Sequence, residues 1–135
     1  MTVRIGTDII EISRIQAANA NNERFKDRIL SAQELEHFKT LAPVSQLNFL
    51  AGRFSAKEAY AKAMGTGIGR LKFSDITILP NDQGRPIILD GPIVKGAQVS
   101  ISHCKEYATA VVLFELSEEV IEKQWHQFLA QKGME

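Results

Sequence analysis

The hydrophobic pattern of the chain is clearest over residues 49–69, which read FLAGRFSAKEAYAKAMGTGIG. At the helical period of about 100° per residue, one apolar stripe collects Leu47, Leu50, Ala51, Phe54 and Ala61. Pro43 suits a first helical turn, and Gly65 suits the position just after a last turn. The pattern therefore predicts a long helix that starts at Pro43, ends before Gly65 and leads into a glycine-rich loop.

Glu58 falls inside this apolar stripe, where an isolated charge is costly. Such a carboxylate should be neutral, paired or bound to a metal ion. Lys62 follows one turn later, in the Glu-then-Lys order that favours an ion pair on a helix. The helix alone leaves open whether Glu58 forms an ordinary ion pair at the edge of the stripe or carries chemistry.

Residues 3–10 alternate in a way that predicts a half-buried strand. One face holds Val3, Ile5, Thr7 and Ile9, and the other holds Arg4, Gly6, Asp8 and Ile10. Asp8, followed three residues later by Glu11, also resembles the start of a helix. Asp8 is therefore either the N-cap of that helix, which is the commoner role, or a carboxylate available for chemistry.

The remaining pattern predicts short elements around the long helix. Two short helices with a break at residues 19–22 fit residues 11–30. Ser31 and Glu34 form a capping box that starts a helix over residues 32–40. Strand patterns cover residues 73–79, 85–89, 97–103 and 107–114, the last two as a hairpin. The predicted fold class is α+β.

The C-terminal residues predict an amphipathic helix capped by Ser117. Its apolar stripe contains Ile121, Trp125, Phe128 and Leu129. We expect this helix to pack on the domain or on a neighbouring subunit. A membrane-surface role is less favoured, because the polar face is not rich in lysine and arginine.

Composition narrows the class of protein. The chain of 135 residues carries 16 basic and 16 acidic residues, so no global field favours nucleic acid or a membrane surface. Its length fits one domain with its own core. Cys104 is the only cysteine, which excludes an internal disulfide and suits a reducing compartment. The sequence contains neither a signal-peptide pattern nor an apolar run that could span a bilayer.

Two candidate motifs fail on geometry. The run Thr66-Gly67-Ile68-Gly69 follows a helix, whereas Rossmann and P-loop sites need a strand, then glycines, then a helix. Its backbone amides could still face a phosphate. His103 and Cys104 are adjacent in a predicted strand and point to opposite faces, so they form no thiol-protease pair. His103 can still donate a hydrogen bond to a phosphate.

Two charged groups stay open on residue pattern alone. Arg14, Arg24 and Arg28 lie near Phe25 and form either a solvated face, which the pattern favours, or a basic patch with an apolar centre. Asp8 and Glu58 form an acidic pair whose proximity the pattern does not fix. Such a pair could hold Mg²⁺ together with substrate phosphates, which would suit a phosphoryl-type transfer.

Three blocks of the sequence resemble a known family. Residues 5–15 (IGTDIIEISRI), 54–59 (FSAKEA) and 100–103 (SISH) resemble the three signature blocks of the 4′-phosphopantetheinyl transferases. The small bacterial holo-acyl-carrier-protein synthase type is the most similar, and the resemblance extends from about Arg4 to about Phe114.

The resemblance implies a fold in which a long central helix packs on a small, mainly antiparallel sheet. It also implies a reaction in which the 4′-phosphopantetheine arm of coenzyme A moves to a serine of apo acyl carrier protein, with release of 3′,5′-ADP. Asp8 and Glu58 would hold Mg²⁺, and Lys62 would neutralise phosphate charge and could protonate the leaving group. Glu58 and a metal-bound water are both open as acceptors of the serine proton.

The same resemblance implies binding residues and partners. Arg53, Pro86 and His103 would contact the nucleotide of coenzyme A, beside Lys62 and the loop that begins at Gly65. The carrier protein is acidic, so the resemblance replaces the solvated-face interpretation with a docking patch. That patch consists of Arg14, Arg24, Phe25 and Arg28. The implied setting is fatty acid biosynthesis in the cytoplasm.

The resemblance further implies a homotrimer with active sites between subunits. The transferase domain would span residues 1–116, and residues 117–135 would form a helical extension past the usual end of the family. Cys104 stands where the family often has threonine. Two alternatives are a binding module or inactive relative, and a coenzyme A-linked hydrolase or acyltransferase. The intact Asp8, Glu58 and Lys62 argue against the first, and the lack of a nucleophile–base pair argues against the second.

Overall fold

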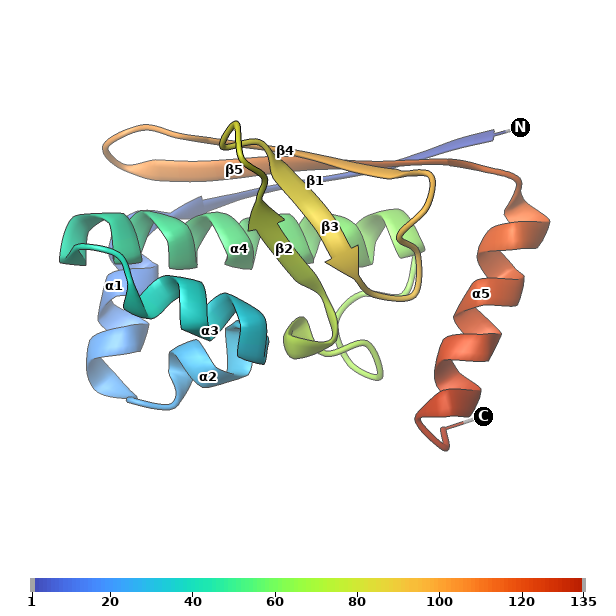
Figure 1. Cartoon of the computed structure of the whole chain (residues 1–135), viewed down its shortest axis with the longest axis horizontal. Coiled ribbons are helices and arrows are strands. Elements are labelled where there is room, and N and C mark those ends of the chain that lie inside the picture. The colour runs from blue at the N-terminus through green and yellow to red at the C-terminus, as the bar shows by residue number, and fades with distance from the viewer. Residues whose placement is uncertain (1, 135) are drawn as a thin grey trace.

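The computed structural model describes residues 2–134 of the chain (Figure 1). Met1, at the start of the predicted transferase domain (1–116), and Glu135, at the end of the predicted extension (117–135), lie outside the described residues. The elements in chain order are β1 (Thr2–Glu11), α1 (Ile12–Asn21), α2 (Phe25–Ile29), α3 (Ala32–Lys39), α4 (Pro43–Met64), the 3₁₀ turn η1 (Phe73–Asp75), β2 (Thr77–Pro80), β3 (Pro86–Asp90), β4 (Ala97–His103), β5 (Tyr107–Leu116) and α5 (Glu118–Gln131).

The long helix α4 lies between a sheet and the shorter helices. β5 pairs antiparallel with both β1 and β4 and forms a three-stranded sheet of order β1-β5-β4. The hairpin β2-β3 crosses beside α4, and α1, α2 and α3 lie on the side of α4 away from the three-stranded sheet (Figure 1). The predicted α+β fold with a long helix on a mainly antiparallel sheet is confirmed.

The alternation of β1 is confirmed, but the face with more branched apolar residues points outward. Val3, Ile5 and Ile9 are exposed by 58%, 61% and 64%, whereas Gly6 is buried against α4. A side chain at Gly6 would collide with the Ala59 carbonyl oxygen and lie 2.7 Å from Ala63 N. The absence of a side chain at Gly6 therefore lets strand and helix touch through their backbones.

Helix α4 is buried over more of its circumference than the predicted stripe implied. Lys57 has no exposed surface, and Arg53 is only 8% exposed. Lys57 Nζ pairs with the fully buried carboxylate of Glu34 and donates to the Ile29 carbonyl oxygen at 2.7 Å. Glu34 also accepts a hydrogen bond from Ile78 N at 2.7 Å. A buried ion pair holds together because each charge is also hydrogen-bonded.

Short sequence patterns correctly predicted where most helices and strands begin or end. Ser31 and Glu34 form the predicted capping box at the start of α3, and Gly65 ends α4 with a φ of 80°. The break between the first two helices comes slightly later than predicted, between Asn21 and Phe25. The strand predicted from Phe73 starts only at Thr77, because residues 73–75 form the 3₁₀ turn.

The C-terminal helix α5 packs on the same chain. Ser117 caps it by accepting a hydrogen bond from Val120 N at 3.2 Å. Ile121, Trp125 and Leu129 are buried in the core cluster that also contains Met64 and Leu71, and Phe128 packs against it partly buried. In Figure 1, α5 stands at one end of α4, and both termini lie at that end. No helix within residues 2–134 has the length and apolar character needed to cross a membrane.

We predict that Gly6→Ala lowers the free energy of unfolding by about 3 kcal/mol, because the new methyl group forces β1 away from α4. Gly52→Ala is the matched control: its methyl group would meet only the Cγ2 methyl group of Ile101, at 3.2 Å, and no backbone atom within 4 Å outside its own helix. We expect the control to change stability by at most about 1 kcal/mol, since alanine favours a helix. Urea unfolding followed by circular dichroism measures both, and equal effects would contradict the prediction.

Candidate active site

Asp8 lies within β1 and does not cap a helix. The strand continues to Glu11, and Glu11 occupies the N-cap position of α1 without a side-chain capping bond. The capping interpretation of Asp8 is therefore wrong. Asp8 does not cap a helix because β1 stays paired with β5 as far as Glu11 and Tyr107, beyond the point where the local pattern suggested a helix.

Two hydroxyl groups hold the backbone at Asp8. Ser55 of α4 donates to the Asp8 carbonyl oxygen at 3.1 Å, and Thr109 of β5 donates to the same atom at 2.8 Å. Neither residue was singled out from the sequence. Ser55 does lie in the FSAKEA block three residues before Glu58, so its place on one side of the helix with Glu58 was available as a signal.

Lys62 joins Asp8 from the last turn of α4. Lys62 Nζ donates to the Thr7 carbonyl oxygen at 2.9 Å and lies 3.4 Å from Asp8 Oδ1. The Lys62 side chain is 54% exposed, so its ammonium group is accessible to a ligand. The ion pair that Lys62 makes in the structure is with Asp8, whereas the sequence pattern had suggested Glu58.

Glu58 completes a cluster of two carboxylates and one ammonium group. Burial raises the pKa of Glu58, the negative charge of Asp8 raises it further, and Lys62 acts in the opposite direction. The structure thus pairs Asp8 with Lys62 and places Glu58 near enough for both charges to act on its pKa. A pocket of about 430 Å³ opens there, lined by Thr7, Asp8, Ile9, Lys62 and Thr109.

The acidic pair fits a hard divalent cation. Asp8 Oδ2 is buried and accepts no hydrogen bond from the described residues, so one ligand oxygen is unsatisfied. Mg²⁺ uses one or two carboxylates and completes its shell with water and substrate phosphates. Within residues 2–134, no three His, Cys, Asp or Glu side chains gather as a ligand cluster. The donor set thus matches Mg²⁺ shared with a phosphate substrate better than a metal held by protein alone.

The other predicted coenzyme A residues lie in two regions. Gly65 directly follows α4, close to Lys62. Pro86 begins β3 and lines a separate pocket with Ser100 and Ile101. His103 is exposed at the end of β4. In this single chain, Pro86 and His103 do not line the pocket that contains Asp8 and Lys62.

Arg53 is an internal residue. Its Nε donates to the Ile78 carbonyl oxygen of β2 at 2.9 Å, and its guanidinium lies 4.0 Å from the centre of the Phe49 ring. Burial lowers the pKa of Arg53 to about 10, against an opposing effect of Glu34. The contacts of Arg53 therefore connect α4 to the hairpin that carries Pro86.

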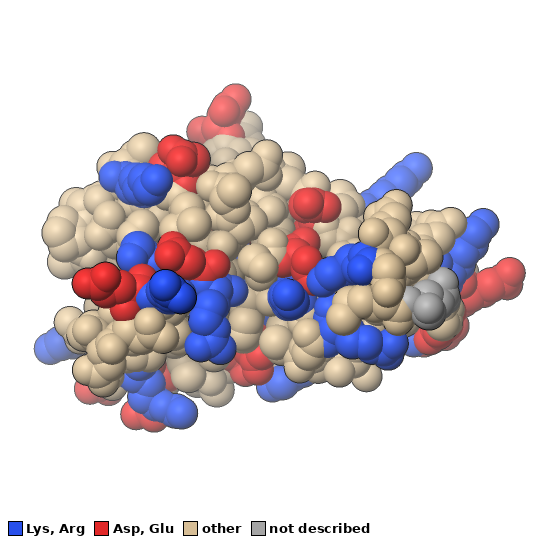
Figure 2. Space-filling view, turned by 90° about the horizontal axis from the view of Figure 1, so that it is seen from below, with Lys and Arg blue, Asp and Glu red and all other residues tan. Residues whose placement is uncertain are grey.

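The predicted docking residues lie on α1, on α2 and at Arg24, the N-cap of α2. Arg14, Arg24 and Arg28 are exposed, and Phe25 is half-buried. Phe25 stacks on Phe54 of α4 with a ring-centre distance of 6.4 Å. Figure 2 shows the helical side of the molecule, where basic and acidic residues are intermixed. The patch is therefore local, in keeping with the zero net charge.

Solved structures with the same fold define the class of protein. The structure resembles a holo-(acyl-carrier-protein) synthase from Bacillus anthracis in complex with CoA (3′,5′-ADP), with a TM-score of 0.76, 43% identity, and 84% and 96% of the two chains covered. It also resembles the holo-[acyl-carrier-protein] synthase from Neisseria meningitidis, with a TM-score of 0.75, 35% identity, and 84% and 98% covered. The fold is that of holo-acyl-carrier-protein synthases.

The sequence then gives the family. The model of the 4′-phosphopantetheinyl transferase superfamily matches residues 4–112, and the chain belongs to this superfamily. The holo-[acyl-carrier-protein] synthase of Geobacillus sp. (strain WCH70) is 48% identical over 116 residues, which are 85% of this chain and 98% of that relative. The predicted family and enzyme class are confirmed: the chain is a 4′-phosphopantetheinyl transferase. Helix α5 lies beyond the residues that the family model matches.

Proposed function

We propose that this chain is a holo-acyl-carrier-protein synthase. It transfers 4′-phosphopantetheine from coenzyme A to a serine of apo acyl carrier protein and releases 3′,5′-ADP. The serine oxygen attacks the phosphorus that bears the pantetheine arm, and the bond from that phosphorus to the departing 3′,5′-ADP breaks. The names of the relatives, and the coenzyme A bound to the Bacillus anthracis protein, support this substrate pair.

The observation that carries the proposal is the convergence of Asp8, Glu58 and Lys62. Asp8 and Glu58 would hold Mg²⁺, which supplies positive charge at the pyrophosphate when bound. Lys62 neutralises charge that develops on the phosphate oxygens and donates a proton to the leaving group. Glu58 or a metal-bound water would accept the proton that the serine loses.

The proposed nucleotide site uses Lys62, the loop that starts at Gly65, Pro86 and His103. Because Arg53 is buried against β2, we assign it an indirect part in this site. It holds the hairpin in which Ile78 pairs with Ile88 and Pro80 with Pro86. The product, a holo carrier protein, serves fatty acid biosynthesis, and we place the reaction in the cytoplasm.

We predict that the chain, coenzyme A and Mg²⁺ add the mass of phosphopantetheine to an apo acyl carrier protein. The increase should disappear with EDTA, which removes the metal ion, and with Glu58→Gln, which removes one of its proposed charged ligands. Intact-mass spectrometry measures the product. A folded protein that binds coenzyme A but transfers nothing to several carrier proteins would instead support a binding module. Release of free thiol or fatty acid from acyl-coenzyme A would indicate a hydrolase.

We predict that Arg14→Glu weakens binding of the carrier protein by about tenfold, as expected when a rim charge facing an acidic partner is reversed. Affinity for coenzyme A should stay nearly unchanged. Lys39→Glu is the matched control, because Lys39 is 68% exposed on α3, outside the proposed patch. Titration calorimetry with each ligand separates the two affinities, and equal losses of both would contradict the docking patch.

We further propose that the chain forms a homotrimer through the outer face of its sheet. Val3, Ile5, Ile9 and Val111 form an exposed apolar surface on neighbouring strands, and such surfaces mark protein contacts. A neighbouring subunit at this face would lie beside Thr7, Ile9 and Thr109, which line the pocket that contains Asp8. It could therefore bring its own Pro86 and His103 to the pocket, from which those residues are separate within one chain.

We predict that Ile5→Asp converts the trimer to a monomer in sedimentation velocity, because a charge in an apolar contact is costly. Val44→Asp serves as the control. Val44 is equally apolar and 75% exposed, but it lies at the start of α4, away from the sheet. A wild-type monomer, or dissociation by both substitutions, would contradict the proposed interface.

A further inference from the structure

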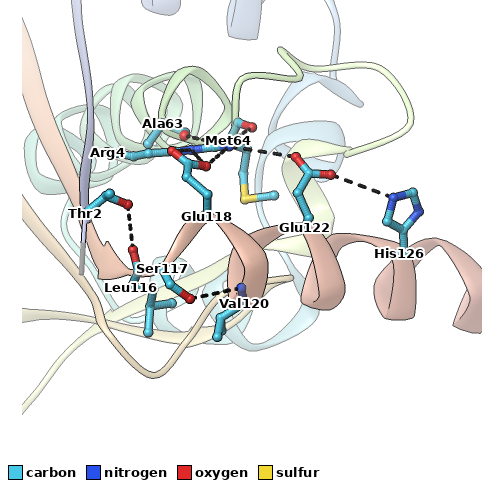
Figure 3. Close-up of polar contacts among 10 residues, drawn as sticks. All are labelled: Thr2, Arg4, Ala63, Met64, Leu116, Ser117, Glu118, Val120, Glu122 and His126. Atoms are coloured by element: carbon cyan, nitrogen blue, oxygen red, sulfur yellow. Dashed lines mark hydrogen bonds and ion pairs between the residues drawn. The ribbon is translucent and has the colours of Figure 1, made fainter.

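One arginine of β1, Arg4, contacts both the C-terminal end of α4 and the start of α5. Arg4 Nη1 donates to the Met64 carbonyl oxygen at 2.8 Å and to that of Ala63 at 3.4 Å (Figure 3). Both carbonyls belong to the last turn of α4, where the helix leaves acceptors unpaired and carries partial negative charge. Arg4 therefore completes the end of the helix that carries Lys62.

The opposite side of the same guanidinium binds α5. Arg4 Nε donates to Glu118 at 3.1 and 2.9 Å, Nη2 also pairs with Glu118, and Nη2 lies 3.8 Å from Glu122 Oε1 (Figure 3). Glu118 occupies the first turn of α5, where a negative charge is favourable. These bonds raise the pKa of Arg4 and lower that of Glu118. One ion pair thus joins the end of α4 to the start of α5.

A second set of contacts fixes the far end of the loop between α4 and η1. Lys132 Nζ donates to the Arg70 carbonyl oxygen at 3.2 Å and pairs with Asp75 at 2.6 Å. The Arg70 guanidinium lies 5.7 Å from the centre of the Trp125 ring. Lys132 and Asp75 are only 23% and 20% exposed, so this pair is partly shielded from water.

The loop of residues 65–70 has little packing of its own. A side chain built at Gly67 or Gly69 would meet no atom within 4 Å, and every residue except Ile68 is exposed. Gly65 and Gly67 adopt positive φ angles of 80° and 66°, a conformation that glycine enters readily but also leaves readily. Ile68 packs against the core cluster, and Thr66 N and Gly67 N each donate to the Ala61 carbonyl oxygen at 3.2 Å. Beyond these few contacts, the conformation of the loop depends on what holds its two ends.

We propose that α5 is a clasp that fixes the loop of residues 65–70 from both ends and thereby sets affinity for coenzyme A, with Arg4 and Lys132 as the positioning residues. The proposal rests on the proposed function, in which this loop borders the nucleotide site. The clasp holds the loop amides in place before the ligand arrives, so less conformational entropy is lost on binding. The match to the family model ends at residue 112, so helix α5 lies outside the matched transferase segment.

The test compares neighbouring carboxylates of α5. Glu118→Gln removes the charged partner of Arg4. Glu119→Gln makes the same change in the same helical turn, at a residue whose side chain makes no hydrogen bond or ion pair within residues 2–134. Lys132→Met, at the C-terminal end of α5, and Lys123→Met, at an exposed position within the helix, form a second pair. Circular dichroism confirms that each variant folds.

Glu118→Gln and Lys132→Met should each raise the Kd for coenzyme A about fivefold, at the low end of typical coupling between sites. The kcat and the KM for the carrier protein should stay within about twofold, because the contacts of the reacting groups are unchanged. Amide hydrogen exchange of residues 65–70 should become faster in the ligand-free protein. The two controls should match the wild type in all four measurements.

The readouts separate this proposal from the proposed function. If the wild type does not bind coenzyme A, the proposed function fails, and the hold on the loop is still judged by hydrogen exchange. Faster loop exchange without a change in Kd would overturn the link between the clasp and affinity. Unchanged loop exchange, or equal effects of Glu118→Gln and Glu119→Gln, would overturn the clasp itself.

Discussion

The close contact between β1 and α4 is the constraint on which the rest of the structure depends. Gly6 brings the strand against the helix backbone at Ala59 and Ala63. Arg4 and Asp8 flank Gly6 on the same face of β1, so both reach the last turns of α4. The contact of Gly6 with α4 therefore places Asp8 beside Lys62, and it places Arg4 at the carbonyl groups of the last turn of α4. A larger residue at Gly6 would move both ends of this arrangement together.

Burial of α4 on several sides explains what the sequence pattern could not predict. A helical stripe identifies the core when a helix has one solvent face, but α4 contacts the sheet, the hairpin and the shorter helices. Lys57 and Arg53 are polar in any pattern, yet they lie inside because Glu34, Ile29 and Ile78 supply their partners. Those partners are 23 to 28 residues away in sequence, so no local rule connects them.

The ends of elements were predictable because their causes are local. The capping box at Ser31, the left-handed Gly65 and the cap at Ser117 each involve residues within one turn. The role of Asp8 was different, since Asp8 and Glu11 satisfy a helix-start pattern that the strand pairing with β5 overrides. The sequence blocks indicated the family and the acidic pair, whereas the proximity of Asp8 to Lys62 and Glu58 required the fold.

Arg4 of β1 contacts both the end of α4 and the start of the C-terminal helix α5. The apolar stripe of α5 predicted packing, and Ile121, Trp125 and Leu129 do enter the core. The stripe did not predict that Glu118 pairs with Arg4, because the two residues are 114 positions apart in the sequence. Arg4 serves the unpaired carbonyls of α4 and the negative first turn of α5 with different nitrogens, so the same charge satisfies both helix ends. The glycine loop begins where α4 ends, and α5 helps to hold that end. Helix α5, although outside the matched transferase region, can therefore act on the proposed coenzyme A site.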